Sequence, residues 1–473
     1  MLAGLAEHCA GTLAATGAAS VSVAVARDGE VVHAEAAGLA DVAAGRPATT
    51  GTAYLLASVT KPITATGVCL AAEAGLLDLD DPVEKHLGGI RLPRRRHRGA
   101  PTVRQVLGHR AGLGGHFDFS YADEPAALPP ARRAIERYGT LYHEPGSRFE
   151  YSNLGYGVLD VVLENVTGRD PAAYARDRIF APLGLTSCHI GPSYEGPAGE
   201  AVRHSADGLP YPVYDTSHRG ASLGWATAPD LAMFGLTQAG GPGVLGPAAT
   251  AAMRAALPVG AGRGDGLGYG LGWFVSRSGG HEIVGHSGSM GGVATMLAVV
   301  PGLRLAVSVL TNSSGAAART SVVEYVMAEL VPGFTAAALP PFPVRERAMR
   351  VPPGAWEGLI GTEAGAVPLA LRLGADGRLA ARLDGGEPAP ALIVTASADW
   401  DLRAAFALQL PTPDARLNTP LLMLELNEER GTLTGAARAV KNGEDGGRLG
   451  NQLSHWCELN PAEDSGLVGA EQE

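Results

Sequence analysis

Lysine is nearly absent from this chain, which uses arginine for almost all of its cations. Of 37 lysines and arginines together, only Lys61, Lys85 and Lys441 are lysines. An arginine keeps its proton inside a protein, whereas a desolvated lysine can lose it. A lysine kept in a chain of this composition therefore indicates a chemical use for its amine.

Cysteines and long apolar runs are scarce as well. The four cysteines are widely scattered, with no Cys-x-x-Cys and no histidines at ligand spacing, which argues against a metal site and for free thiols. Pro301 and Arg304 interrupt the most apolar region, so no segment reaches the length of a membrane helix. The first twenty residues carry Glu7 and His8 and lack a basic leader. We therefore expect a soluble, cytoplasmic protein with no metal, no cofactor and no membrane partner.

The chain also lacks an excess of basic over acidic residues. The net charge of -11 disfavours nucleic acid as the main partner, because nucleic-acid-binding proteins usually present a basic face. The one basic run, residues 91–98, is short, broken by Pro93 and free of aromatic residues. We interpret it as a solvated loop rather than a phosphate-binding patch.

The residues around Lys61 form the strongest local signal. Ser58 and Lys61 stand three residues apart at the start of an Ala-rich segment with helical spacing, so both face the same side of the predicted helix. There the amine can take the hydroxyl proton and turn a weak nucleophile into a usable one. Because proline is tolerated only in the first turn of a helix, Pro62 places Ser58 at the helix N-terminus. Taken alone, the pattern also fits a solvated Ser and Lys pair.

Two further clusters carry polar groups that suit the same chemistry. Tyr151-Ser152-Asn153 is the only Tyr-x-Asn in the chain and directly precedes a helical pattern; a tyrosine near a lysine can act as a general base, and an amide can hold a substrate carbonyl. His286-x-Gly288 opens onto β-like residues, where an edge strand could offer backbone N–H groups to an oxyanion. Taken alone, helix capping by Asn153 and packing of Tyr151 would be the more common explanation of this motif.

The order of patterns predicts an α+β catalytic domain and a second, all-β domain. Strand-like segments occur near the N-terminus and between residues 272 and 310, around a mostly helical middle, so we expect one antiparallel sheet flanked by helices with an inserted helical lobe. Alternating apolar residues after the proline-rich linker predict a small antiparallel barrel. The predicted divisions are 1–338 for the first domain, 339–354 for the linker, 355–460 for the barrel and 461–473 for a disordered acidic tail.

The three motifs, in this order, resemble those of the class C β-lactamase-like serine hydrolases, over about residues 5–330. That superfamily includes β-lactamases, DD-peptidases, D-aminopeptidases, esterases and acyltransferases. Tyr-Ser-Asn replaces the general Ser-Asp-Asn, as is typical of the class C branch, and His-Ser-Gly replaces Lys-Thr-Gly. The C-terminal β-segments, with Trp356-Glu357-Gly358, are similar to the lipocalin-like domain appended to some members.

The resemblance implies a role for each motif residue. Ser58 would be the acyl-forming nucleophile, with Lys61 and Tyr151 sharing its proton. Backbone N–H groups of Ser58 and Ser289 would hold the oxyanion. The substrate-binding residues would be Asn153, His286, Gly288 and Ser289, with His286 supplying a weak, titratable cation in place of the usual lysine.

We therefore expect a serine hydrolase acting on a small ester or amide. D-aminopeptidase, DD-peptidase or β-lactamase activity is the alternative, followed by acyl transfer in a biosynthetic pathway and by a pseudoenzyme that binds a ligand without turnover. A rival nucleophile, Ser222 in Gly220-x-Ser222-x-Gly224, lacks the preceding buried strand that an α/β-hydrolase elbow requires. The sequence leaves the oligomeric state open, a homo-oligomer included.

Overall fold

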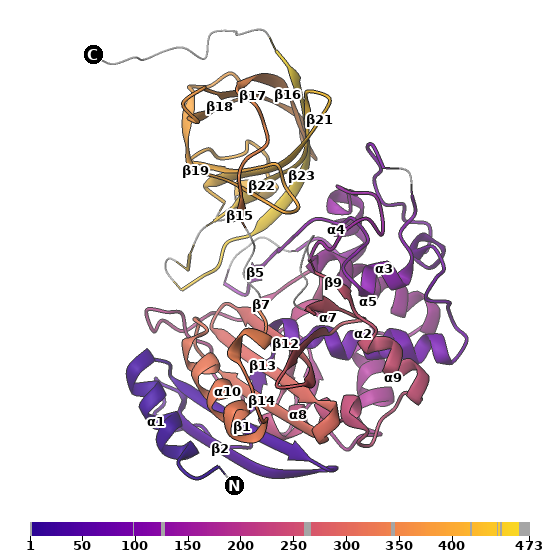
Figure 1. Ribbon diagram of the computed structural model, residues 1–473, viewed down its shortest axis with the longest axis vertical. Coiled ribbons are helices and arrows are strands. Elements are labelled where there is room, and N and C mark those ends of the chain that lie inside the picture. Colours follow the sequence, from indigo (N-terminus) through magenta and orange to yellow (C-terminus); the bar gives the residue numbers. More distant parts are fainter. Residues whose placement is uncertain are drawn as a thin grey trace.

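The structure is a computed structural model of the 473-residue chain. It describes residues 2–97, 99–123, 128–259, 266–341, 346–416, 419–441, 443–444 and 447–462. Two bodies stand one above the other, a large mixed α and β domain and a β-barrel (Figure 1).

The large domain is built on a nine-stranded antiparallel sheet. β1 pairs with β14, so the N-terminal hairpin joins the strands that follow the helical middle, as the sequence predicts. The hairpin turns at Asp28 and Gly29, both with positive φ. In spatial order the strands are β3 (Arg46–Pro47), β2 (Glu30–Asp41), β1 (Ser20–Arg27), β14 (Leu305–Thr311), β13 (Val293–Val300), β12 (His281–Met290), β11 (Phe274–Ser278), β10 (Gly268–Tyr269) and β9 (Leu257–Pro258).

Helices cover both faces of this sheet. On one face α1 (Leu5–Thr16) and α10 (Ala317–Leu330) pack on the central strands around a core that includes Val23, Val307 and Val323. On the other face α8 (Ala228–Leu236) contacts β1 and β14. The strands are thus apolar on both faces, which explains their almost uninterrupted Val, Ala and Leu content.

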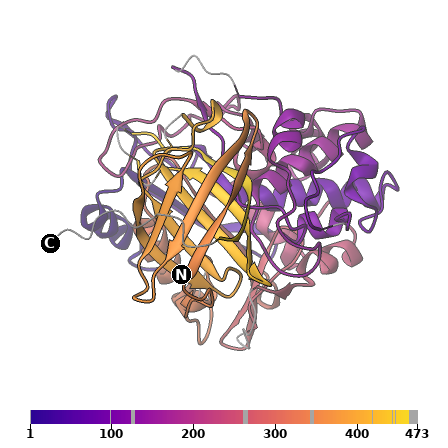
Figure 2. The same ribbon diagram turned by 90° about the horizontal axis from the view of Figure 1, so that it is seen from above.

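The helical lobe lies beside the sheet (Figure 2). Three of its helices begin at side-chain caps, and at α6 the Asp170 carboxylate accepts the Ala173 N–H. Thr102 and Gln105 form a capping box at α3, and the Ser152 hydroxyl accepts the Gly155 N–H at the start of α5. The helices of this region are α2 (Thr60–Glu73), α3 (Val103–Leu107), α4 (Ala131–Tyr138), α5 (Asn153–Thr167), α6 (Pro171–Ala175), α7 (Arg219–Ser222) and α9 (Pro247–Arg254), with a π turn at Arg176–Phe180.

Short elements join the lobe to the sheet. The 3₁₀ turn η1 (Ala57–Val59) leads directly into α2. A small three-stranded sheet next to it contains β4 (Tyr54–Leu55), β8 (Gly224–Ala226) and β6 (His189–Ile190). A two-stranded ribbon, β5 (Ser120–Tyr121) with β7 (Tyr214–Asp215), lies on the side of the domain that faces the barrel (Figure 1).

The C-terminal body is a closed antiparallel barrel, as the sequence predicts. Each strand pairs with its neighbour in sequence, and β16 pairs with β23 to close the ring. This up-and-down arrangement is the lipocalin architecture. Its strands are β16 (Gly354–Thr362), β17 (Gly365–Leu373), β18 (Leu379–Leu383), β19 (Ala389–Ser397), β20 (Leu402–Phe406), β21 (Leu421–Glu429), β22 (Thr432–Val440) and β23 (Gln452–Pro461), with the short β15 (Glu346–Arg347) paired to β19.

Several details differ from the sequence predictions. The predicted helix after Ser58 is α2, which ends at Glu73, two residues before Gly75 adopts a positive φ. β16 begins at Gly354, inside the expected linker, and β23 reaches Pro461. The expected tail lies outside the described residues from 463 onward, and so do linker residues 342–345.

The structure also places Ser222 and the basic run, which the sequence analysis singled out. Ser222 lies on the short helix α7, with only the two-residue β7 before it, so the structure holds no hydrolase elbow there. In the basic run, Arg94 pairs with Glu84 at 2.8 Å and Arg96 pairs with Glu458 of the barrel at 2.9 Å. These arginines are used in contacts within the molecule.

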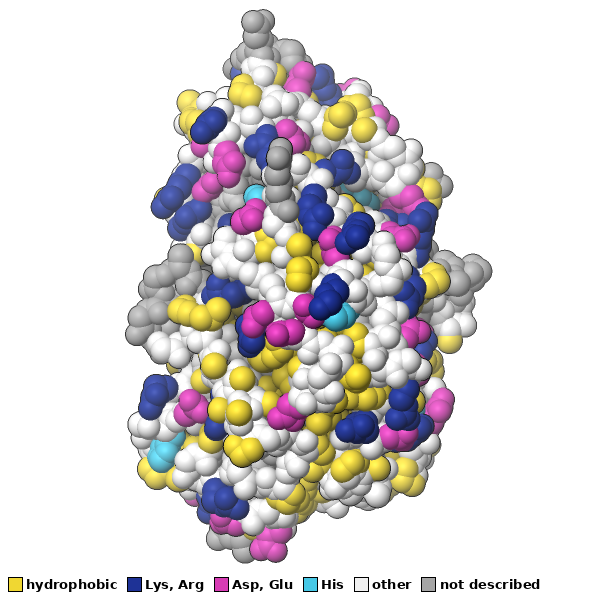
Figure 3. Space-filling model, turned by 90° about the vertical axis from the view of Figure 1, so that its right-hand side faces the viewer, with side chains coloured by type: hydrophobic (Ala, Val, Ile, Leu, Met, Phe, Trp, Pro, Cys, Tyr) yellow, Lys and Arg dark blue, Asp and Glu magenta, His cyan; other side chains and the backbone are white. Residues whose placement is uncertain are grey.

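Surface charge is mixed over the face of the helical lobe. Lysine and arginine side chains alternate with aspartate and glutamate there, and apolar side chains gather in the lower half of the view (Figure 3). Within the described parts of the chain, no helix is both long and apolar enough to cross a membrane.

Candidate active site

Ser58 occupies a sharp turn that several hydrogen bonds fix. Ala57 has φ 48°, an unusual value for a residue with a side chain, and it turns the chain from β4 into η1. The Leu56 N–H donates to the Gly224 carbonyl at 2.7 Å, and the Thr295 hydroxyl donates to the Leu56 carbonyl at 2.7 Å. Ser58 itself is half-buried at the start of α2, as the position of Pro62 predicts.

Lys61 lies directly behind Ser58 and is completely buried. Its Nζ donates to Ser58 Oγ at 3.2 Å, to Asn153 Oδ1 at 2.6 Å and to the Ala221 carbonyl at 3.0 Å. Among the ion pairs of the described residues, none involves Lys61. Burial without a carboxylate partner lowers the pKa of Lys61 well below its usual range. Burial therefore favours the neutral form of this amine.

Tyr151 completes this group. Its ring centroid is 4.8 Å from Lys61 Nζ, and its hydroxyl shares a hydrogen bond with Ser58. Burial raises the pKa of Tyr151 well above its usual value, and the hydrogen bond with Ser58 offsets this only in part. The structure thus brings Ser58, Lys61 and Tyr151 together, with the tyrosine held as a phenol at neutral pH.

Asn153 is the first residue of α5 and is buried next to Lys61. Its Oδ1 accepts the Lys61 amine, and its Nδ2 donates to the His116 carbonyl at 3.3 Å. Both ends of the amide are therefore engaged with the protein in this structure. Asn153 fixes the amine of Lys61 on the side opposite Ala221.

Gly288 explains how β12 comes close enough to Ser58. A Cβ at this position would lie 2.3 Å from the Leu56 carbonyl oxygen and 2.2 Å from Thr295 Oγ1. Only glycine allows this approach. The His286-x-Gly288 pattern therefore places the strand against the turn that carries Ser58.

Ser289 lies at an open edge of the same strand. Met290 and Val293 flank the two-residue turn at Gly291 and Gly292, so they form the hydrogen-bonded pair of the hairpin. Pair types alternate along the strand, which directs the Ser289 N–H away from β13. On that side β11 pairs with β12 only as far as Gly285, and the exposed Ser289 N–H is free of a strand partner.

His286 does not behave as the sequence suggested. It is buried, its Nδ1 donates to the Ser287 carbonyl at 2.7 Å, and its Nε2 lies 3.3 Å from the Tyr269 hydroxyl. Burial, assisted by Lys61, lowers the pKa of His286 to about 3. The expectation of a titratable cation on β12 is therefore wrong, because desolvation keeps this imidazole neutral.

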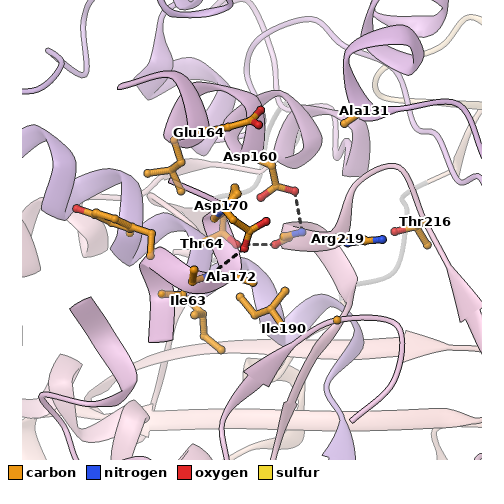
Figure 4. A pocket seen from close by; sticks show the side chains of 18 of the residues that line it. Ile63, Thr64, Ala131, Asp160, Glu164, Asp170, Ala172, Ile190, Thr216 and Arg219 are labelled. Atoms are coloured by element: carbon orange, nitrogen blue, oxygen red, sulfur yellow. Dashed lines mark hydrogen bonds between the residues drawn. The ribbon is translucent and has the colours of Figure 1, made fainter. Parts of the chain in front are cut away.

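A separate cavity of about 630 Å³ lies between α2, α5 and α6, and none of its lining residues is one of the seven predicted site residues (Figure 4). The cavity is connected to the candidate site only by hydrogen bonds among residues that line it. Asp160 Oδ2 accepts the Gly220 N–H at 2.8 Å, and the Thr64 hydroxyl donates to the Gly220 carbonyl at 2.8 Å. Gly220 directly precedes Ala221, whose carbonyl holds Lys61. Burial raises the pKa of Asp160 to about 7.

Comparison with known proteins fits this arrangement of residues. The family described as Beta-lactamase matches residues 5–331. This chain belongs to the beta-lactamase family.

The curated proteins that are similar to this chain include penicillin-binding proteins and an esterase. Penicillin-binding protein 4 of Amycolatopsis lactamdurans is 30% identical over 313 residues, which cover 62% of this chain and 80% of that protein. Penicillin-binding protein 4* of Bacillus subtilis (strain 168) is 26% identical, over 58% of this chain and 64% of its own length. Esterase EstB of Burkholderia gladioli is 35% identical over 211 residues, covering 40% of this chain and 50% of the esterase. The chain thus spans between half and four fifths of these proteins.

Solved structures extend the likeness to both bodies of the molecule. SurE superposes with a TM-score of 0.62 at 23% identity, covering 95% of this chain and 98% of that one. The octameric penicillin-binding protein homologue from Pyrococcus abyssi superposes with a TM-score of 0.60 at 22% identity, covering 96% and 99%. The fold of this beta-lactamase family member is therefore shared over the barrel as well.

Sequence reasoning missed two groups in the site of this family member. His109, with φ 55°, holds both neighbours of Tyr151: its carbonyl accepts the Glu150 N–H at 2.8 Å and its Nδ1 accepts the Ser152 N–H at 3.1 Å. Its position directly after a capped helix was the only available signal. The Ala221 carbonyl left no signal at all, because a backbone group has no side-chain signature.

Proposed function

We propose that this protein is a serine hydrolase that forms an acyl-enzyme at Ser58 from a small ester or amide. The observation that supports this most strongly is the buried amine of Lys61 at 3.2 Å from Ser58 Oγ, with no carboxylate beside it. A buried neutral amine within hydrogen-bond distance is a general base for a serine hydroxyl. The identity of EstB as an esterase agrees with this class of substrate.

The pKa directions assign different tasks to the two partners of Ser58. In acylation, Ser58 Oγ forms a bond to the substrate carbonyl carbon and its proton passes to Lys61 Nζ. As the bond to the leaving group breaks, the leaving group takes the phenolic proton of Tyr151, and the proton on Lys61 returns to Tyr151. Water then reverses these steps at the ester. The cycle ends with the amine and the phenol neutral, which is the pair that burial favours.

The backbone N–H groups of Ser58 and Ser289 would hold the oxyanion that forms during acylation. Ser58 stands where the N–H groups of a helix start are unpaired, and the Ser289 N–H points out of an open strand edge. Gly288 keeps these two donors close together. Asn153 acts here by holding Lys61 and His116, in addition to any contact with substrate.

A neutral His286 favours uncharged substrates over penicillins and D-Ala-D-Ala peptides, which carry a carboxylate. Arg319 is a cation near the Gly288 end of this strand, and it donates to the Gly288 carbonyl at 3.5 Å from a fully buried position. It is not presented to the cleft. We therefore rank esters and simple amides first, and acyl transfer to another acceptor uses the same acyl-enzyme.

Intact mass measurement after a fluorophosphonate tests the proposal. We expect one adduct per chain in the wild type, none in Ser58→Ala, and normal labelling in Ser222→Ala, which removes the rival serine. A folded wild type without adduct, as a non-catalytic binding protein would give, or equal labelling of Ser58→Ala, overturns the assignment. Parallel reactions with an aryl ester, a D-aminoacyl anilide, a cephalosporin and an added alcohol acceptor then separate the substrate classes.

Compartment and assembly are proposals of the same kind. All four cysteines are free, and three of them are buried, which supports a reducing compartment such as the cytoplasm. A homo-oligomer is supported by exposed apolar side chains on the barrel, at Leu359, Leu392 and Ile393. Light scattering coupled to size exclusion gives the assembly directly.

A further inference from the structure

The barrel is attached to the chain segments that position Tyr151 and Asn153, and its strand β23 forms the first attachment. Phe117 and Gln452 exchange two backbone hydrogen bonds, at 2.9 and 2.8 Å, and the Phe119 N–H donates to Asn451 Oδ1 at 2.7 Å. The Ser454 hydroxyl also donates to the Gly115 carbonyl. Residues 115–119 are therefore bound along the edge of the barrel.

This segment in turn supports α5 and its first residues. The His116 carbonyl accepts Asn153 Nδ2, and the Gly114 carbonyl accepts the Ser152 hydroxyl at 2.8 Å. Asn153 holds Lys61, so a line of hydrogen bonds leads from β23 to the catalytic amine.

Arg438 on β22 provides the second attachment, and it is buried at the junction of the two bodies. It lies 3.2 Å from Glu150 Oε1 and 2.7 Å from Glu425 Oε2. A Cβ on Gly115 would come within 2.9 Å of its Nη1. One guanidinium thus contacts both segments that position the site, and Glu150 is the residue directly before Tyr151.

From these contacts we propose that Arg438 of the barrel is a positioning residue for Tyr151, acting through Glu150, so that the barrel is part of the active site. The inference rests on the function proposed above. The Glu150 carboxylate is held by the guanidinium of Arg438, and the Glu150 N–H is held by the His109 carbonyl. Arg438 and His109 together therefore set the position of the Tyr151 backbone.

The surrounding charges show why the arginine is needed there. Burial raises the pKa of Glu150 to about 7, with the carboxylates of Glu425 and Asp399 acting in the same direction and Arg438 and Arg148 opposing them. His143 lies 4.0 Å from Glu150, and burial keeps it neutral with a pKa lowered to about 2. Without Arg438, two buried carboxylates would share one junction, which is unfavourable for both.

The test compares two substitutions of the same kind on the two partners of Arg438. Glu150→Gln removes the partner next to Tyr151, and Glu425→Gln removes the partner inside the barrel. The readouts are the rate constant for fluorophosphonate labelling of Ser58 and the kcat and KM for an aryl ester. We expect Glu150→Gln to lower the labelling rate constant and kcat about tenfold with little change in KM, and Glu425→Gln to change them less than about twofold.

Arg438→Met should slow labelling by about tenfold to a hundredfold. Arg438→Lys should recover part of that loss, because an ammonium keeps the positive charge but lacks the paired N–H donors of a guanidinium. The double variant Arg438→Met with Glu150→Gln should label no more slowly than the slower single variant, since the two residues act as a unit. Arg382→Met, which changes an arginine on the outer side of β18 near Glu357, serves as the unchanged control.

The outcomes separate this inference from the proposed function. If Arg438→Met and Glu150→Gln melt at lower temperature yet label at the wild-type rate, Arg438 only stabilises the barrel and the inference is wrong. If Arg438→Met does not fold, Arg438→Lys and Glu150→Gln carry the test. If the wild type itself gains no adduct at Ser58, the proposed function fails instead.

Discussion

The two sides of the candidate site are held in different ways. The nucleophile side, residues 54–61 with 286–289, is fixed inside the large domain by the turn at Ala57, by Thr295 and by the close approach at Gly288. The tyrosine side, residues 109–119 with 148–153, carries Tyr151 and depends on the barrel. Its link between Glu150 and Arg438 joins residues 288 positions apart. The family match ends at residue 331, so the barrel residues that hold this side of the site lie outside the matched segment.

Because of this difference, we expect substitutions on the two sides to affect turnover in different ways. The nucleophile side has few degrees of freedom, so changes there should abolish turnover or break the fold. The tyrosine side is set by contacts between two bodies, and those contacts can shift by small amounts without unfolding either one. We therefore expect graded effects on the tyrosine side and all-or-none effects on the nucleophile side.

The largest expected effect is that of Lys61→Arg. The substitution replaces an amine that can be neutral with a permanent cation, because a guanidinium does not lose its proton in a protein. Labelling of Ser58 should fall by about 1,000-fold or more. Lys85→Arg is the matched control, since Lys85 is exposed and pairs with Asp81 at 2.8 Å. Retention of more than a tenth of the wild-type rate by Lys61→Arg would show that Lys61 is not the base.

Gly288→Ala should have the next largest effect. Its new methyl group would overlap the Leu56 carbonyl and Thr295, so β12 must move away from Ser58 and carry the Ser289 N–H with it. We expect a loss of about 100-fold in kcat and about 1–3 kcal/mol in the free energy of unfolding.

Gly285→Ala, on the same strand, provides the comparison for Gly288→Ala. A Cβ there would approach the Leu297 carbonyl at 2.7 Å, which overpacks the sheet at a distance from the Ser58 turn. It should cost stability to a similar degree with a much smaller loss of kcat. Equal kinetic losses in the two variants would mean that overpacking of the sheet, rather than the oxyanion donor, explains the result.

The sequence predicts the features of the two sides that depend on local patterns. It does not predict those that depend on contacts between segments far apart in the chain. The meeting of Ser58, Lys61 and Tyr151 follows from three motifs in a fixed order, and the sheet and barrel follow from alternating apolar patterns. The neutral state of His286 does not, because it results from burial beneath Tyr269 and the neighbouring strands. The ties of Glu150 to Arg438 and of Phe117 to Gln452 join segments about 300 residues apart, and no local pattern marks such a pair.

Asn451→Ala tests the tyrosine side with a smaller perturbation. The Phe119 N–H loses its acceptor and is left unpaired in a buried place, which costs about 1–3 kcal/mol and loosens residues 115–119. Labelling of Ser58 should slow by about threefold to tenfold. Asn427→Ala makes the same chemical change wholly within the barrel, where Asn427 accepts the Asp401 N–H at 3.2 Å. If both variants lose stability and neither changes the labelling rate, the tyrosine side does not depend on the barrel.

Asp160→Asn should have the smallest effect on turnover and a distinct effect on stability, because it alters the support behind Lys61 without breaking it. The amide oxygen can still accept the Gly220 N–H, so Ala221 stays in place and kcat should change less than about twofold. Asp160→Ala removes that acceptor, and its kcat should fall further.

The pH dependence gives the sign of the Asp160 effect. Burial raises the pKa of this carboxyl to about 7, so between its ordinary pKa near 4 and about 7 the folded chain binds the proton that the unfolded chain has lost. Wild-type stability should therefore fall as the pH rises through this window, and Asp160→Asn should remove that fall. Urea unfolding at pH 5 and pH 8 measures it, with an expected difference of about 2 kcal/mol, less than the full shift because the carboxyl lines a cavity that admits water. A wild type and variant with parallel pH profiles would mean that Asp160 is ionised in the folded protein, and that the nucleophile side is supported by a charge rather than by a neutral hydrogen bond.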